Sequence, residues 1–171
     1  MNEFYEKVIS IADNLHRDLN KIYQPPEEGS KSYYQNIIPD SIVRNTRGYI
    51  EKVVNQINGC YEKGWYDACA VMIRRLLETL IIEVFEYKKI DNKIKNSQGD
   101  FFQLDDLINL TLMEPLWNIS RNSKGAFPRL KKVGDLSAHN RRYVAHLKDI
   151  EKIKDDVRII TQELISLSGL K

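Results

Sequence analysis

The sequence contains few of the features that define several common classes of protein. Only two of its 171 residues are cysteine, which excludes a disulfide framework and predicts a reducing compartment. Its most apolar run, residues 76–85, is interrupted by Glu78 and Glu83 and is far shorter than the ~20 residues that span a bilayer. The N-terminus lacks the basic start and apolar run of a signal peptide. We therefore expect a cytoplasmic protein that does not associate with a membrane.

Signatures of metal and cofactor binding are also missing. The sequence has no glycine-rich phosphate loop, no HExxH pattern and no nucleophile elbow of a Ser-His-Asp hydrolase. His139 and His146 lie two helical turns apart, about 10 Å along a helix axis, which is too far to share one ion. Asp135 and His139 alone are too few ligands for a transition metal. We expect no metal and no cofactor.

Helical periodicity dominates the remaining sequence. No segment alternates apolar and polar residues as a half-buried strand does, and no internal repeat occurs. Apolar stripes at helical spacing predict helices at about 3–22, 41–62, 65–87, 104–112 and 149–167, and a further one that starts near Pro128. The helix at 65–87 is apolar on most of its circumference, so it should lie at the centre. The sequence predicts an all-α fold, a single bundle of about five to six helices.

Prolines and glycines indicate the boundaries. Pro25-Pro26 and the polar residues 27–32 end the first helix, so residues 1–38 should form an N-terminal helix with a linker, and residues 39–171 the bundle. Residues 88–100 and 120–125 are expected to be loops. Pro128 suits the first turn of a helix, where its missing N–H costs nothing. How far this helix continues stays open, because Gly134 and Asn140 both weaken it.

The most informative segment for function is the basic stretch at residues 117–148. It contains eight cationic residues and one carboxylate, Asp135, which gives a net charge of +7. The whole chain carries +2, so the remainder carries −5. A positive field of this size favours an anionic ligand, of which phosphate is the commonest. The alternative is a basic helix face that contacts only solvent.

Asp135 and His139 are the candidates for chemistry within this stretch. They lie one helical turn apart, so a hydrogen bond between them is expected if the segment is helical. An aspartate that orients a histidine in a cationic site suits metal-free RNA cleavage, in which the histidine takes a proton from a ribose 2′-hydroxyl. The alternative is a structural hydrogen bond that holds this helix to its neighbour. The residues alone favour neither interpretation.

Two short motifs occur in an order that resembles a known family. Residues 60–70 and the following Arg74-Arg75-Leu76-Leu77-Glu78 resemble the first half of a HEPN (higher eukaryotes and prokaryotes nucleotide-binding) domain. Residues 134–139, Gly-Asp-Leu-Ser-Ala-His, are similar to a segment of a bacterial HEPN-like family of unknown function. The resemblance covers about residues 40–167. From the residues themselves, Arg74, Arg75 and Glu78 are first expected to form a structural ion-pair set.

The resemblance implies a helical bundle that pairs as a homodimer. Many HEPN proteins are metal-independent RNases of toxin–antitoxin or antiviral defence systems, with a motif of an arginine, four to six further residues and a histidine. By this resemblance His139 takes the histidine place and Asp135 the polar place, whereas Gly134 stands where the arginine belongs. Lys132 has the permitted spacing and is the candidate replacement. Further candidates for binding phosphate are Arg129, Lys131, Arg141 and Arg142.

These observations lead to two expectations about function. In the first, the protein binds RNA or a nucleotide through the basic stretch, either as a metal-independent endoribonuclease or as a degenerate member that only binds. In the second, it is a non-catalytic adaptor or interaction subunit of a defence system, whose basic stretch meets an acidic partner protein.

Overall fold

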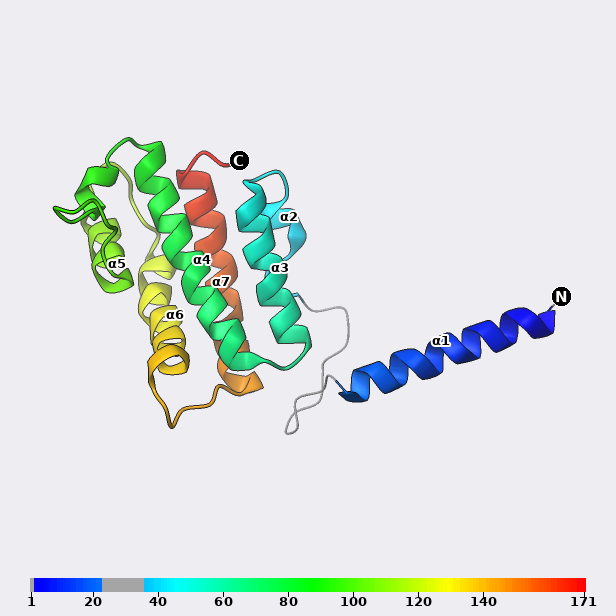
Figure 1. Cartoon of the computed structure of the whole chain (residues 1–171). Coiled ribbons are helices and arrows are strands. Elements are labelled where there is room, and N and C mark those ends of the chain that lie inside the picture. Colours follow the sequence, from blue (N-terminus) through cyan, green and yellow to red (C-terminus); the bar gives the residue numbers. More distant parts are fainter. Residues whose placement is uncertain (1, 23–35) are drawn as a thin grey trace.

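The computed structural model describes residues 2–22 and 36–171, and their ordered structure is helical (Figure 1). The helices are α1 (Asn2–Ile22), α2 (Asp40–Val43), α3 (Gly48–Glu62), α4 (Tyr66–Tyr87), α5 (Leu104–Met113), α6 (Arg121–His139) and α7 (Leu147–Leu167), with a short 3-10 helix, η1 (Asp91–Ile94). The described residues form no strand, only one isolated bridge between Lys95 and Phe101. The all-α prediction is confirmed.

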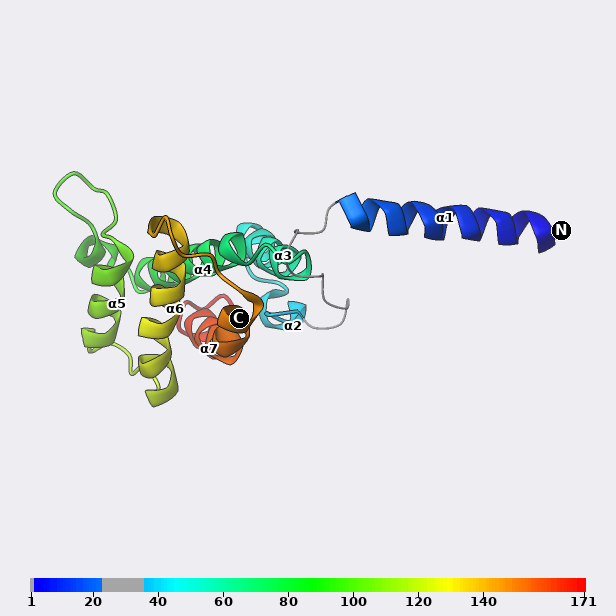
Figure 2. The same ribbon diagram turned by 90° about the horizontal axis from the view of Figure 1, so that it is seen from below.

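Helix α4 lies at the centre of the bundle, as predicted. It packs against α3, α6 and α7 and also contacts α5 and η1. In Figure 2, which looks up from below, α4 lies between α3 and α6. Both of its apolar stripes are buried; Leu76 and Leu77 are each 2% exposed. No helix in the described ranges is long and apolar enough to cross a bilayer.

The predicted helix at 41–62 is in fact two helices, because the chain turns between α2 and α3. Asn45 adopts a left-handed conformation with φ of 68°, which asparagine tolerates better than most residues. Its backbone N–H donates to Glu51 Oε1 at 2.9 Å, and the Thr46 hydroxyl donates to the Val43 carbonyl at 2.6 Å. These two local hydrogen bonds replace helical ones and stabilise the break.

Residues 120–125 are not the loop that the sequence suggested. Ser120 is the N-cap of α6, and its Oγ accepts from the Ser123 N–H at 3.2 Å. Glu163 of α7 accepts from the Ser120 N–H at 2.6 Å, from the Ser120 hydroxyl at 2.7 Å and from the Ser123 hydroxyl. Helix α6 therefore begins at Arg121, and Pro128 lies inside it rather than in its first turn. The helix ends at His139.

Residues 36–38 are hydrogen-bonded to α3 and α7 of the bundle. Asn58 of α3 accepts from the Ile38 N–H at 3.1 Å and donates to the Ile38 carbonyl at 2.9 Å. Arg158 of α7 donates to the carbonyls of Ile37 and Asn36 at 2.7 and 2.9 Å. Ile37 and Ile38 are fully buried, so these residues belong to the bundle although we expected it to start at 39. The linker predicted around Pro25 and Pro26 lies outside the described residues.

Candidate functional site

A cavity of about 760 Å³ opens between α5 and α6. It contains five of the seven residues that the sequence singled out, namely Lys131, Lys132, Asp135, His139 and Arg141. They meet here because positions three and four apart share one face of a helix, and α6 runs without a break to His139. Arg141 follows directly after that helix. The remaining lining comes from Asp105, Ile108, Asn109, Leu112, Pro128, Leu136 and Asn140.

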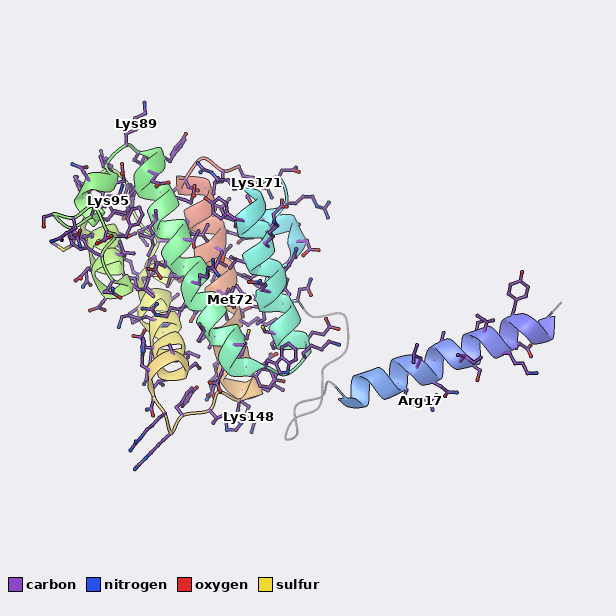
Figure 3. All side chains as sticks on the ribbon, in the orientation of Figure 1. Arg17, Met72, Lys89, Lys95, Lys148 and Lys171 are labelled. Atoms are coloured by element: carbon purple, nitrogen blue, oxygen red, sulfur yellow. The ribbon has the colours of Figure 1, made fainter. Side chains whose placement is uncertain are left out.

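The cavity has an apolar wall and a cationic rim. Ile108 and Leu112 of α5 and Leu136 of α6 all line the cavity, and Ile108 is buried. Lys132 and Arg141 are exposed cationic side chains at the same cavity. Figure 3 shows that Lys148 lies at the end of the bundle where α6 leads into α7, the end that also carries Arg142. The site thus combines an apolar surface with positive charge.

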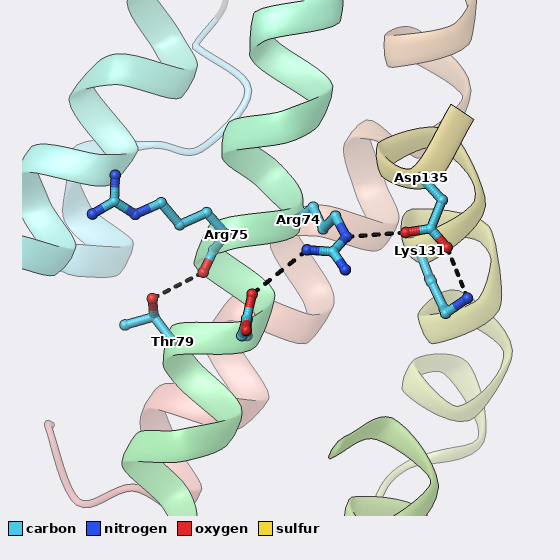
Figure 4. Close-up of polar contacts among 6 residues, drawn as sticks. Arg74, Arg75, Thr79, Lys131 and Asp135 are labelled. Atoms are coloured by element: carbon cyan, nitrogen blue, oxygen red, sulfur yellow. Dashed lines mark hydrogen bonds and ion pairs between the residues drawn. The ribbon is translucent and has the colours of Figure 1, made fainter. Parts of the chain in front are cut away.

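Asp135 is held in an ion-pair network that crosses three helices, of which Figure 4 shows the contacts between α4 and α6. Arg74 Nε of α4 donates to Asp135 Oδ1 at 3.0 Å, and Lys131 Nζ donates to Asp135 Oδ2 at 2.7 Å. Lys131 Nζ also lies 3.3 Å from Asp105 Oδ1 of α5. Partial burial raises the pKa of Asp135, but the hydrogen bonds from Lys131 and Arg74 outweigh it and lower the pKa below its ordinary value.

The predicted hydrogen bond between Asp135 and His139 is not formed. Both oxygens of the carboxylate are occupied, one by Arg74 and one by Lys131. His139 is exposed, and its imidazole makes no hydrogen bond or ion pair with another residue of the described chain. Asp135 therefore does not fix the tautomer of His139, and its observed role is to link α6 to α4.

Three of the predicted cations have no ion-pair partner among the described residues. The side chains of Lys132, Arg141 and Arg142 are exposed and form no ion pair within residues 2–22 and 36–171. Arg129 differs, because its Nε and Nη2 donate to Asp156 of α7 at 2.6 and 2.7 Å. This hydrogen-bonded pair raises the pKa of Arg129 and places the residue outside the cavity lining. Arg129 therefore links α6 to α7 through an ion pair and is not part of the site.

The ion-pair set expected on α4 is formed in part. Arg74 Nη1 lies 3.6 Å from Glu78 Oε2, one helical turn away. Arg75 is exposed and its guanidinium makes no ion pair with a described residue, although its backbone carbonyl accepts from the Thr79 hydroxyl (Figure 4). The two neighbouring arginines therefore have different environments.

At Gly134 the backbone of α6 lies close to the side chain of Arg74 on α4. A Cβ atom at this position would lie 2.7 Å from Arg74 Cβ and 3.2 Å from Arg74 Cγ and Cδ. Such distances leave no room for any side chain unless the helices separate. The stem of Arg74 therefore fills the space that a side chain at position 134 would need.

The sequence did not identify the α5 wall or the participation of Arg74. Ile108 and Leu112 are four residues apart on an apolar stripe, a signal that equally describes core residues. Arg74 lies 61 residues from Asp135, and no local pattern predicts such a pairing. These contributions depend on how the helices pack.

Together the fold and the site define a small helical-bundle protein with a cation-rimmed cavity. The chain belongs to the family described as "Domain of unknown function (DUF4145)", whose model matches residues 55–171. This range includes α4, α5, α6 and α7 and hence every residue of the cavity. Comparisons with curated proteins and with solved structures found no match.

Proposed function

We propose that this protein is a HEPN-like protein that binds RNA, or a nucleotide, in the cavity between α5 and α6. The observation that carries the proposal is the combination of unpaired cations with an apolar wall. Lys132 and Arg141 have no protein partner in the described chain, so their charge is available for phosphate. Ile108 and Leu112 offer an apolar surface for a base or sugar.

The charge balance of the cavity supports an anionic ligand. Of the lining carboxylates, Asp105 is close to Lys131, and Asp135 is paired with both Lys131 and Arg74. Lys132 and Arg141 then remain as excess positive charge, and Arg142 adjoins them. A phosphate group bound there would replace water on groups that already point to solvent, so no existing ion pair has to break.

RNA cleavage is a second candidate function, favoured by one observation. The His139 imidazole is exposed in the cavity lining alongside Lys132 and Arg141, the arrangement that general acid–base cleavage of RNA needs. The geometry favours binding more strongly, because no carboxylate orients this histidine. The resemblance to HEPN proteins adds the expectation of a homodimer in a defence or toxin–antitoxin system.

Binding of labelled single-stranded RNA to the full-length protein tests the proposal. Affinity should fall steeply with salt, and the double variant Lys132→Ala/Arg141→Ala should lower it and reduce the slope of log affinity against log salt by about 0.7 for each lost phosphate contact. Lys52→Ala is the matched control, since Lys52 is an exposed lysine of α3 away from the cavity. It should change neither quantity.

Two results would refute RNA binding by this cavity. One is no binding by the parent protein at low salt, and the other is an equal effect of Lys52→Ala. Either result favours the adaptor function, in which the basic rim meets an acidic partner protein. Incubation of the same proteins with mixed RNA in EDTA tests cleavage, which should be lost in His139→Ala if the histidine is the acid or base.

A further inference from the structure

The contact between Arg74 and Gly134 fixes the position of a guanidinium outside the cavity. The aliphatic stem of Arg74 lies against the backbone of Gly134, which is buried. From there its Nε reaches Asp135 Oδ1 at 3.0 Å, and its Nη1 lies 3.6 Å from Glu78. Arg74 is not among the residues that line the cavity, whereas Asp135 is.

Asp135 would oppose an anionic ligand if it had no partner on α4. Lys131 alone is insufficient to neutralise the lining carboxylates, because its Nζ is shared between Asp135 at 2.7 Å and Asp105 at 3.3 Å. Two carboxylates would then face one ammonium group at the wall of the cavity. With Arg74 bound, the two lining carboxylates are balanced by two cations, Arg74 and Lys131, and Lys132 and Arg141 stay in excess.

We infer that Arg74 is a positioning residue for anion binding, which acts from outside the cavity by neutralising Asp135 and holding its carboxylate toward α4. This inference rests on the proposed function of the cavity. In this role Arg74 affects ligand binding without contacting the ligand. The inference also explains why a carboxylate is compatible with a phosphate site.

A purely structural role for Arg74, as a tie between α4 and α6, makes a different prediction. If the tie alone matters, removing Asp135 is as harmful as removing Arg74, and removing both does not help. If neutralisation matters, removing the Asp135 charge makes Arg74 dispensable. The two roles can therefore be separated by asking whether removing the Asp135 charge restores the binding that is lost on removing Arg74.

The experiment measures binding of fluorescein-labelled single-stranded RNA to full-length protein at low salt. Arg74→Met keeps an unbranched stem over Gly134 and removes the charge, and it should weaken binding roughly three- to tenfold, the scale for two unit charges about 4 Å apart in water. Arg74→Met/Asp135→Asn should bind within about twofold of Asp135→Asn, the tolerance for independent sites. Arg75→Met is the matched control, because it removes the same charge from the next residue of α4, which faces solvent. It should bind like the parent.

Each outcome decides the inference. Equal affinities for Arg74→Met and Arg75→Met would overturn it, and so would a weak Arg74→Met that Asp135→Asn does not restore. If Arg74→Met alone fails to fold, the double variant decides, since it no longer leaves the Asp135 carboxylate without its partner on α4, and weaker binding than Asp135→Asn would overturn the inference. RNA binding that depends on Lys132 and Arg141 but not on Arg74 overturns this inference and leaves the proposed function intact. A parent protein that binds no RNA overturns both.

Discussion

The close approach of α6 to α4 predicts opposite effects for two glycine substitutions in the same helix. At Gly134 an added Cβ would lie 2.7 Å from Arg74 Cβ. Because both atoms are attached directly to the backbone, neither can rotate away, and the two helices must move apart. At Gly125, also in α6, the nearest atom to an added Cβ is Arg129 Nη1 at 3.5 Å, an ordinary contact with the end of a flexible side chain.

The magnitudes follow from two effects of opposite sign. Replacing glycine by alanine within a helix stabilises it by about 1 kcal/mol, and this gain is common to both positions. Overpacking a close contact costs about 1–3 kcal/mol and applies only at Gly134. Gly125→Ala should therefore raise the free energy of unfolding by up to about 1 kcal/mol. The free energy of unfolding of Gly134→Ala should be about 1–3 kcal/mol lower than that of Gly125→Ala, because the difference between the two variants is the packing cost.

Urea denaturation of the full-length variants, followed by circular dichroism, measures both free energies. Equal stabilisation by the two substitutions would show that α4 and α6 are not in close contact at Gly134. The same reasoning applies to Gly134→Arg, which introduces the arginine expected from the resemblance to HEPN proteins. Its side chain begins with the same Cβ, so we expect it to destabilise the bundle rather than to raise activity.

Three further predictions concern the core, the pH dependence and the cavity. Leu76→Ala should lower the free energy of unfolding by about 2–5 kcal/mol, since Leu76 is 2% exposed at the centre of the bundle; a loss below about 0.5 kcal/mol would contradict its central position. Burial raises the pKa of Glu163, but hydrogen bonds from Ser123 and Ser120 outweigh it and hold the pKa below 4.5. The contribution of Glu163 to stability is therefore present above that pH and lost as the pH falls through the lowered pKa. Denaturation curves should show that Glu163→Gln destabilises the protein more at neutral pH than in acid. An equal effect at both pH values would contradict a lowered pKa. Asp105→Asn should strengthen RNA binding, because it removes a negative charge from the cavity lining and leaves Lys131 paired with Asp135 alone. The neighbouring exposed Asp106→Asn should not strengthen it, and unchanged binding in Asp105→Asn would count against Lys131 as part of the site.

The sequence predicted those elements whose signal is local and continuous. Helix α4 has two complete apolar stripes over 22 residues, so its length and central position could be inferred directly. The start of α6 could not, because the hydrogen bonds that stabilise it come from Glu163, some 40 residues away in the sequence. Pro128 suggested a helix start, yet this single residue was outweighed by a cap that depends on packing with α7.

The candidate site divides in the same way. Helical spacing predicted that Asp135 and His139 lie one turn apart on the same helix, and both line the cavity together with Lys131 and Lys132. The choice of partner for Asp135 could not be predicted, because His139 is near in sequence and Arg74 is near in space. A carboxylate four residues from a histidine is thus weak evidence for a hydrogen bond when other helices also offer cations.

The net charge of the basic stretch illustrates why a count of charges overestimates a binding surface. Of its eight cations, Arg129 is neutralised by Asp156 of α7, and Lys131 by Asp135 and by Asp105 of α5. The carboxylates that neutralise Arg129 and part of Lys131 lie outside residues 117–148, so the sum of +7 does not include them. The field that a ligand meets comes from the cations left unpaired by packing, and in the cavity lining these are Lys132 and Arg141. For this reason substitutions at Lys132 and Arg141 test RNA binding more directly than a substitution at Arg129, whose loss would also break a link between α6 and α7.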